Sequence, residues 1–254
     1  MGKIITLHSN RGGVGKTLIS VNLAIAYASL GRNVCLFDLD FRAPSLFEIF
    51  HLERPRYWMN DFLNGRCKIW DVIVDLTERY GTKGRLLLGL ANPALDSIID
   101  MTSKDKRWEM KALQILHSVK EEVGEDVEFI LFDTSPGYLY SSVNAVACSD
   151  VVIVITTADM LDIGGTERIT KELYRAFEKA TFILVNKVLP EFQWREEDKG
   201  DVLKRFSTQF NVPILAVIPC YCDMLNSSKM KIYTLEKPGH PFSKVIYDVA
   251  KKLS

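Results

Sequence analysis

The chain has 254 residues, of which 47% are hydrophobic, enough to build a single buried core. Lysine plus arginine and aspartate plus glutamate both number 32, so a global basic field for nucleic acid is excluded and only a local basic patch could bind it. The five cysteines lack the spacing of a disulfide-rich domain, and neither a signal peptide nor a membrane-spanning run of roughly 18 apolar residues is recognisable, so we expect a cytoplasmic protein without a stable membrane anchor.

Strand and helix patterns alternate along the chain. In chain order, buried strands are predicted at residues 3–8, 33–38, 85–91, 128–133, 150–157, 181–188 and 213–219. Segments with helical periodicity lie between them, for example at residues 18–30, 108–123 and 167–180, and a final helix is predicted near the C-terminus. Residues 54–83 are the least regular part and are predicted to form a surface excursion. The alternation predicts one α/β domain over residues 1–254, with a mostly parallel central sheet of about seven strands and helices on both faces.

A glycine-rich loop follows the first predicted strand and precedes a helix, with the sequence SNRGGVGKT over residues 9–17. Glycines allow the backbone N–H groups to turn inward towards a phosphate, and the following helix presents its positive end. Lys16 can reach the outer phosphates, and the Thr17 hydroxyl can serve as a magnesium ligand. We therefore predict a nucleotide-binding loop formed by Arg11, Gly12, Gly13, Val14, Gly15, Lys16, Thr17 and Leu18.

Carboxylates end two of the predicted strands. Asp38 and Asp40 come at the end of the second strand, two residues apart, so they point to the same side. Asp133 directly follows the buried run FILF, at the strand edge where a carboxylate can orient magnesium-bound water. Asp133 and Thr17 are therefore predicted to be magnesium ligands.

The segment from Arg11 to Thr17 resembles the deviant phosphate-binding loop of the ParA/MinD family of P-loop ATPases, and the resemblance extends over nearly the whole chain. In that family a lysine at the position of Arg11 reaches across an ATP-sandwiched dimer to the partner's phosphates. Asn10 departs from the usual pattern, which has glycine there. The resemblance implies ATP and Mg²⁺ as ligands and adds Asp38 to Thr17 and Asp133 in the magnesium site, as a residue that supports the ion through water. It also assigns catalytic roles to Lys16, Arg11 and Asp40, the last as the residue that positions the attacking water.

The same resemblance assigns a switch and a base pocket. The run DTSPG over residues 133–137 is similar to the family's second switch, in which the Gly137 N–H would sense the γ-phosphate. In the family, the edges after two later strands close around adenine. They imply that Asn186, Pro219, Cys220 and Asp223 contribute to base binding.

The function implied is that of an ATPase switch. ATP would bring two subunits together, the homodimer would recruit a protein activator or cargo adaptor, and slow, partner-stimulated hydrolysis would release it. The cargo could be DNA, a division-site system or another assembly, because the partner surface rather than the fold sets the biology.

Two other functions use related folds. An iron-sulfur carrier or targeting ATPase would need cysteines at a dimer seam, and the chain offers only Cys220 and Cys222. A phosphotransferase is the other alternative, although the tyrosine-rich tail of bacterial tyrosine-kinase relatives is absent from this sequence.

The surface and the C-terminal helix give weaker signals. Residues 105–117 and 190–194 are possible docking sites. Six apolar residues form one face of the last helix, and because the chain stops at Ser254 we expect this face to pack on the sheet rather than on lipid.

Overall fold

The computed structural model describes residues 2–189, 206–225 and 232–254. Its centre is an eight-stranded sheet in the order β3-β4-β2-β5-β1-β6-β7-β8. The strands are β1 (Lys3–His8), β2 (Val34–Leu39), β3 (Ile73–Asp75), β4 (Leu86–Gly89), β5 (Phe129–Thr134), β6 (Val151–Thr157), β7 (Ala180–Val188) and β8 (Ile214–Pro219). All neighbouring strands run parallel except β3, which is antiparallel to β4 at one edge.

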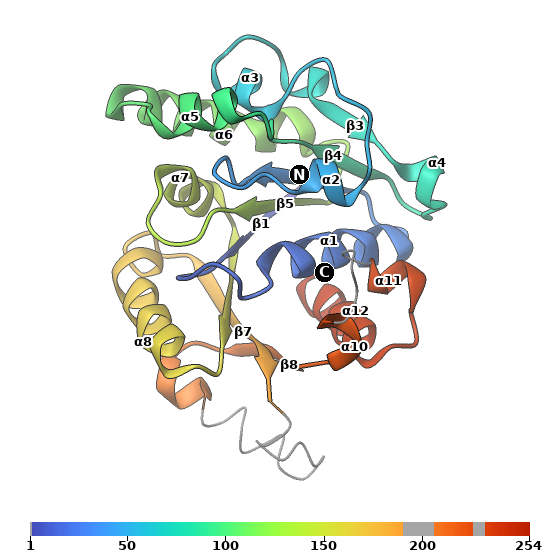
Figure 1. Cartoon of the computed structure of the whole chain (residues 1–254), viewed down its shortest axis with the longest axis vertical. Coiled ribbons are helices and arrows are strands. Elements are labelled where there is room, and N and C mark those ends of the chain that lie inside the picture. Colours follow the sequence, from blue (N-terminus) through green and yellow to red (C-terminus); the bar gives the residue numbers. More distant parts are fainter. Residues whose placement is uncertain (1, 190–205, 226–231) are drawn as a thin grey trace.

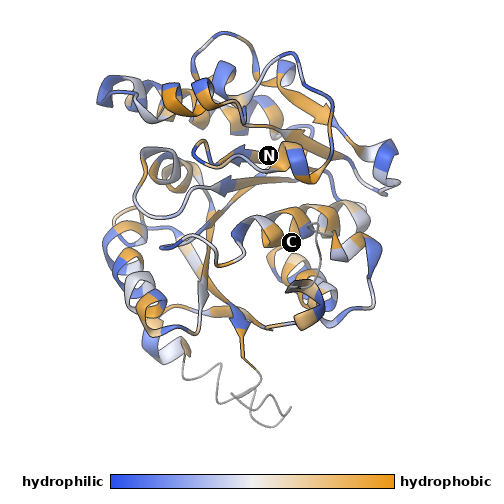
Figure 2. Ribbon diagram, viewed as in Figure 1, coloured by the Kyte–Doolittle hydropathy of each residue, from blue (hydrophilic) through white to orange (hydrophobic). Residues whose placement is uncertain are grey.

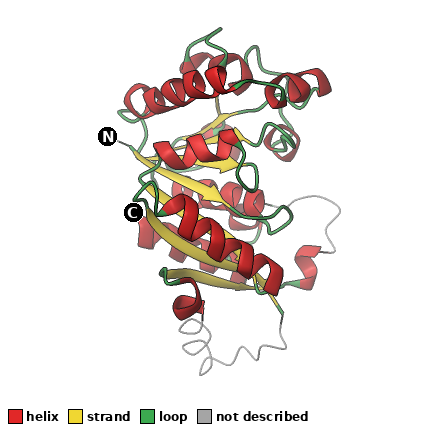
Figure 3. Cartoon of the chain, turned by 90° about the vertical axis from the view of Figure 1, so that its left-hand side faces the viewer, coloured by secondary structure: helices red, strands yellow, loops and turns green. Residues whose placement is uncertain are grey.

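Helices cover both faces of the sheet, which confirms the predicted α/β fold (Figures 1 and 3). One face carries α1 (Lys16–Ser29), α11 (Tyr233–Glu236) and α12 (Pro241–Leu253), with the short α10 (Cys222–Leu225) beside them. The other side carries α3 (Met59–Leu63), α6 (Lys106–Val123), α7 (Tyr140–Cys148), α8 (Met160–Ile169) and the π-helical segment η2 (Thr170–Tyr174). The remaining short elements are α2 (Leu46–Ile49), η1 (Ile69–Asp71), α4 (Thr77–Tyr80) and α5 (Leu95–Thr102).

The core lies on both sides of the sheet because successive strand residues point to opposite faces. Ile5 and Leu7 of β1 pack into the cluster that contains α1 and α12, whereas Ile4 packs into the cluster on the opposite face. Figure 2 shows largely hydrophobic strands at the centre, flanked by helices in which hydrophobic and hydrophilic residues alternate. As expected, the apolar face of α12 is buried against α1 and β8.

Two predictions of secondary structure were incomplete. The strand β3 lies inside residues 54–83 and brings the sheet to eight strands; with three residues, it is too short to give a recognisable alternating pattern. The helix predicted at residues 167–180 in fact begins at Met160, where Asp159 caps it by accepting hydrogen bonds from the N–H groups of Leu161 and Asp162. The pair Gly164-Gly165 obscures the helical pattern of this first part. At the other end, Glu178 takes a left-handed φ of 50°, and Ala180 already belongs to β7.

Candidate nucleotide site

The glycine-rich loop lies between the end of β1 at His8 and the start of α1 at Lys16. Gly13 and Gly15 take left-handed φ angles of 78° and 94°, which glycine adopts without the strain of a side chain. No side chain caps α1, and its first turn contains no acidic residue. The helix itself therefore supplies no negative charge at its positive end. This arrangement suits an anion.

Side chains from the end of β7 hold the loop in place. The Asn186 Nδ2 donates to the Val14 carbonyl at 2.8 Å, and the Lys187 Nζ donates to the Gly13 carbonyl at 2.6 Å. A Cβ on Gly15 would lie 2.5 Å from Asn186 Nδ2, so this contact requires glycine. From the sequence, Asn186 was predicted to bind the base and no role was predicted for Lys187. In the structure, both side chains donate a hydrogen bond to a carbonyl of the phosphate loop.

The predicted magnesium residues lie together beside the loop. Asp38 of β2 and Asp133 of β5 are register partners on adjacent strands, and both are 1% exposed. Lys16 Nζ lies 3.7 Å from Asp133 Oδ1, which also accepts a hydrogen bond from the Ser20 hydroxyl at 3.0 Å. Backbone N–H groups of Asp40, Ser45 and Leu46 donate to the Asp38 carboxylate.

The charge balance of this cluster favours a cation. Burial, followed by the negative charges of Asp133 and Asp40, raises the pKa of Asp38 to about 8. Burial also raises the pKa of Asp133, against the lowering effects of Lys16 and of hydrogen bonds from Thr17 and Ser20. Buried carboxylates that repel one another next to a loop hydroxyl are suitable ligands, directly or through water, for a hard divalent cation.

Asp40 is held by the segment after β5. The Ser135 hydroxyl donates to Asp40 Oδ1 at 2.5 Å, and the N–H groups of Arg42 and Ala43 donate to the same oxygen. The Ser135 carbonyl in turn accepts a hydrogen bond from Ser142 of α7 at 2.6 Å. Ser135 therefore fixes the orientation of the carboxylate that was predicted to position water.

Gly137 is fixed through both of its backbone polar groups. Its N–H donates to the Ser9 carbonyl at 2.8 Å, and its carbonyl lies 2.8 Å from Nε2 of His8. His8 Nδ1 lies 2.6 Å from the Tyr174 hydroxyl. Burial, opposed by the Gly137 hydrogen bond and aided by the charge of Lys16, lowers the pKa of His8 to about 4. His8 and Tyr174 were not predicted, because they are far apart in sequence and belong to no motif.

Arg11 and Asn10 both contact α8. Arg11 Nη1 lies 3.6 Å from Asp159 Oδ1, and their side chains are 51% and 60% exposed. A Cβ on Gly165 would collide with the Asn10 side-chain amide, so the asparagine that replaces the usual loop glycine packs against a helical glycine. The loop's two unusual residues thus lie against one helix.

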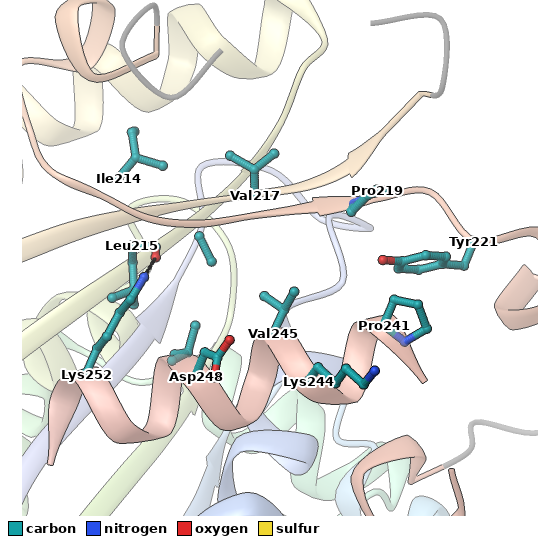
Figure 4. A pocket seen from close by; sticks show the side chains of 12 residues that line it. Ile214, Leu215, Val217, Pro219, Tyr221, Pro241, Lys244, Val245, Asp248 and Lys252 are labelled. Carbon is teal, nitrogen blue, oxygen red and sulfur yellow. Dashed lines mark hydrogen bonds between the residues drawn. The ribbon is translucent and has the colours of Figure 1, made fainter. Parts of the chain in front are cut away.

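The other residues predicted to bind the base are Pro219 at the end of β8, Cys220 directly after it and Asp223 in α10. Cys220 donates its N–H to the Val188 carbonyl at 2.8 Å. The Asp223 carboxylate pairs with Lys237 at 3.2 Å and with His240 at 3.4 Å, which leaves it engaged in an exposed ion-pair cluster. Pro219 lies at one end of a groove of about 400 Å³ between β8 and α12, where Lys252 donates to the Leu215 carbonyl (Figure 4). No residue that lines this groove belongs to the phosphate loop or to its carboxylates.

Other predicted features have simpler outcomes. All five cysteines are free thiols, and the described part of the chain contains no group of three or more His, Cys, Asp or Glu residues arranged to hold a metal. No helix among the described residues is long and apolar enough to cross a membrane. The possible docking segment 105–117 forms part of α6, where Met110 is 70% exposed, whereas segment 190–194 lies outside the described residues.

Comparison with known proteins relates this site to others. A family model described as an AAA domain matches residues 2–185. The septum site-determining protein MinD of Thermotoga maritima is 28% identical over 100% of this chain and 88% of its own length. MinD from Pyrococcus horikoshii, solved in complex with Mg-ADP, superposes with a TM-score of 0.75 at 22% identity over 100% of this chain and 96% of that one. MinD from Aquifex aeolicus, solved in complex with MinC, gives a TM-score of 0.78 at 22% identity over 99% and 95% of the two chains.

Proposed function

The chain belongs to the AAA-domain family and is a ParA/MinD-type P-loop ATPase, and on that premise we propose that it acts as a switch that dimerises when it binds ATP and magnesium. The observation that carries this proposal is the grouping of Lys16, Asp38 and Asp133 at the start of α1, beside a loop with left-handed glycines. These residues fit a magnesium-bound nucleotide in both charge and donor type.

The chain's own residues would divide the work. The loop N–H groups and Lys16 would bind the phosphates, while Thr17, Asp38 and Asp133 would hold the cation or its water. Bound magnesium supplies charge neutralisation on the phosphate oxygens. Asp40, oriented by Ser135, would position the attacking water. The second N–H of Asn186, Pro219 and the backbone from Cys220 to Asp223 would contact adenine.

Dimerisation is supported by the surface around Arg11. Arg11 is half exposed, and its partner Asp159 is an exposed residue of its own chain. Exposed ion pairs contribute at most about 1 kcal/mol, so Arg11 can exchange Asp159 for the phosphates of a second subunit at little cost. Met160 and Leu161, which are 86% and 73% exposed, follow Asp159 and offer apolar area for that second subunit to cover.

The structural relative that was solved with MinC suggests a further step. We infer that a protein activator or cargo adaptor recognises the dimer and speeds a slow hydrolysis. A cytoplasmic location would be consistent with that role. A capture experiment with the Asp40→Ala protein, which we expect to stay in its ATP form, would identify the cargo.

Nucleotide binding is tested first, by calorimetry with Mg-ATP and Mg-ADP. Lys16→Ala should abolish tight ATP binding, whereas Lys106→Ala, which removes an exposed lysine on α6, should not change it. Asp40→Ala should retain binding and lose about tenfold or more in phosphate release. Wild-type affinity in Lys16→Ala would remove the loop assignment.

Sedimentation then tests dimerisation. The wild type should be monomeric without nucleotide and dimeric with Mg-ATP. Arg11→Ala should bind ATP but remain monomeric, Arg11→Lys should retain much of the function, and Arg107→Ala serves as the control for loss of an exposed arginine. If Arg11→Ala dimerises as readily as the wild type, the role across the interface is wrong.

A further inference from the structure

A chain of hydrogen bonds connects η2 with the proposed switch glycine. The Gly137 carbonyl can only accept, so the proton of the neutral His8 ring is on Nε2, which donates at 2.8 Å. Nδ1 is then an acceptor, and the Tyr174 hydroxyl donates to it at 2.6 Å. His8 is fully buried and Tyr174 is 1% exposed, so water does not compete for these bonds.

The same glycine is restrained on its other side. The Gly137 N–H donates to the Ser9 carbonyl at 2.8 Å, while φ is 76°. His8 and Ser9 are the two residues directly before the unusual Asn10-Arg11 pair, so both restraints on Gly137 come from the start of the phosphate loop. Gly137 can offer its N–H to a phosphate only by leaving Ser9.

The next residue forms a second connection to η2. The Tyr138 hydroxyl donates to Glu172 Oε2 at 3.1 Å, two residues before Tyr174. The η2 segment is π-helical, a local departure from regular helix that is frequent at functional sites. Tyr138 is therefore bonded directly to this turn, and Gly137 is connected to it through His8.

We propose that His8, with its proton fixed by Tyr174, holds Gly137 in the position in which its N–H is bonded to Ser9, and so sets how strongly the chain distinguishes ATP from ADP. This inference rests on the proposed nucleotide switch. A γ-phosphate has to draw the Gly137 N–H from Ser9, and the hydrogen bond from His8 opposes that movement. ADP makes no such demand. His8 and Tyr174 are positioning residues, since neither needs to touch the nucleotide.

The decisive variant is Tyr174→Phe, which removes only the hydroxyl that fixes the His8 proton. The free energy of one buried hydrogen bond corresponds to about a fivefold change in an equilibrium constant. The affinity for Mg-AMPPNP relative to Mg-ADP should therefore rise about three- to tenfold. The control is Tyr27→Phe, because the Tyr27 hydroxyl is buried and has no hydrogen-bond partner among the described residues. It should leave the ratio unchanged.

A double-mutant cycle separates this role from a general loss of packing. His8→Gln removes the Nδ1 acceptor, so adding Tyr174→Phe to His8→Gln should change the AMPPNP-to-ADP ratio much less than Tyr174→Phe does alone. Equal effects in both backgrounds would overturn the proposal.

Hydrogen exchange of the nucleotide-free protein gives a readout that needs no ligand. Peptides that cover residues 134–139 should exchange faster in Tyr174→Phe than in the wild type, and at the wild-type rate in Tyr27→Phe. A wild type that binds neither nucleotide would refute the proposed function. If the wild type binds both nucleotides, but Tyr174→Phe leaves both the AMPPNP-to-ADP affinity ratio and the exchange of residues 134–139 unchanged, only the proposed role of His8 would be refuted.

Discussion

Acid should destabilise this protein through one buried histidine. Burial is the main cause that lowers the pKa of His8 to about 4, from 6.5 in an unfolded chain. The folded state keeps His8 neutral, whereas the unfolded state takes up a proton below pH 6.5. The contribution of neutral His8 to the stability of the folded state is therefore complete above pH 6.5 and is lost as the pH falls from 6.5 towards 4.

The size of this effect follows from the two pKa values. One pKa unit corresponds to about 1.36 kcal/mol, so the full loss is about 3 kcal/mol, and about 2 kcal/mol of it falls between pH 7.5 and pH 5. His8→Gln has no group that titrates in this range. The wild type should therefore lose about 2 kcal/mol more than His8→Gln in its free energy of unfolding over that interval.

Equilibrium urea unfolding at pH 7.5 and pH 5, followed by circular dichroism, measures this difference. His117→Gln is the matched control because His117 is exposed on α6. It should follow the wild type at both pH values. If the free energy of unfolding changes equally with pH in the wild type and in His8→Gln, His8 is not held neutral in the folded state. The assignment of its proton to Nε2 would then also be wrong.

Three further experiments test the contacts around the loop. Ser135→Ala removes the hydroxyl that orients Asp40, so phosphate release should fall up to about tenfold while the calorimetric affinity for ATP stays unchanged; an unchanged rate would show that Asp40 needs no such support. Gly165→Ala should push Asn10 away and weaken Mg-ADP binding about tenfold, and adding Asn10→Gly should restore it; binding that is not restored would contradict the steric explanation. Asn186→Ala loses the bond to Val14 and should weaken Mg-ADP binding about five- to tenfold, a larger effect than that of Lys187→Ala, whose contact is exposed.

Local patterns were sufficient to predict most of the sheet and the phosphate loop. Buried parallel strands are continuous apolar runs, and each of the seven predicted strands has a counterpart in the structure. The loop is equally local, since Gly13, Gly15, Lys16 and Thr17 lie within five consecutive residues. Asp38 and Asp133 could be predicted as neighbours because both lie near the carboxyl ends of strands, and those ends meet at one edge of the sheet.

The contacts that hold the loop could not be predicted because they join distant segments. His8 and Tyr174 are separated by 166 residues, and Asn186 and Val14 by 172. Neither pair has a sequence pattern that indicates its partner. The pairing of Asn10 with Gly165 left two visible signals, an asparagine where the loop pattern has glycine and a glycine pair inside a helix, but only the structure shows that each explains the other.

Several of these distant contacts involve α8 and the η2 segment that directly follows it. Asp159 and Gly165 contact Arg11 and Asn10 of the loop, Glu172 accepts a hydrogen bond from Tyr138, and Tyr174 is connected to Gly137 through His8. A phosphate that drew Arg11 from Asp159 would therefore break a contact at the start of α8, and one that moved Gly137 would disturb its connection through His8 to η2. Because α8 also begins with exposed Met160 and Leu161, the helix that contacts Arg11 and Asn10 is the one that would meet a second subunit in the proposed dimer. We therefore expect a change at the loop to reach that surface through α8.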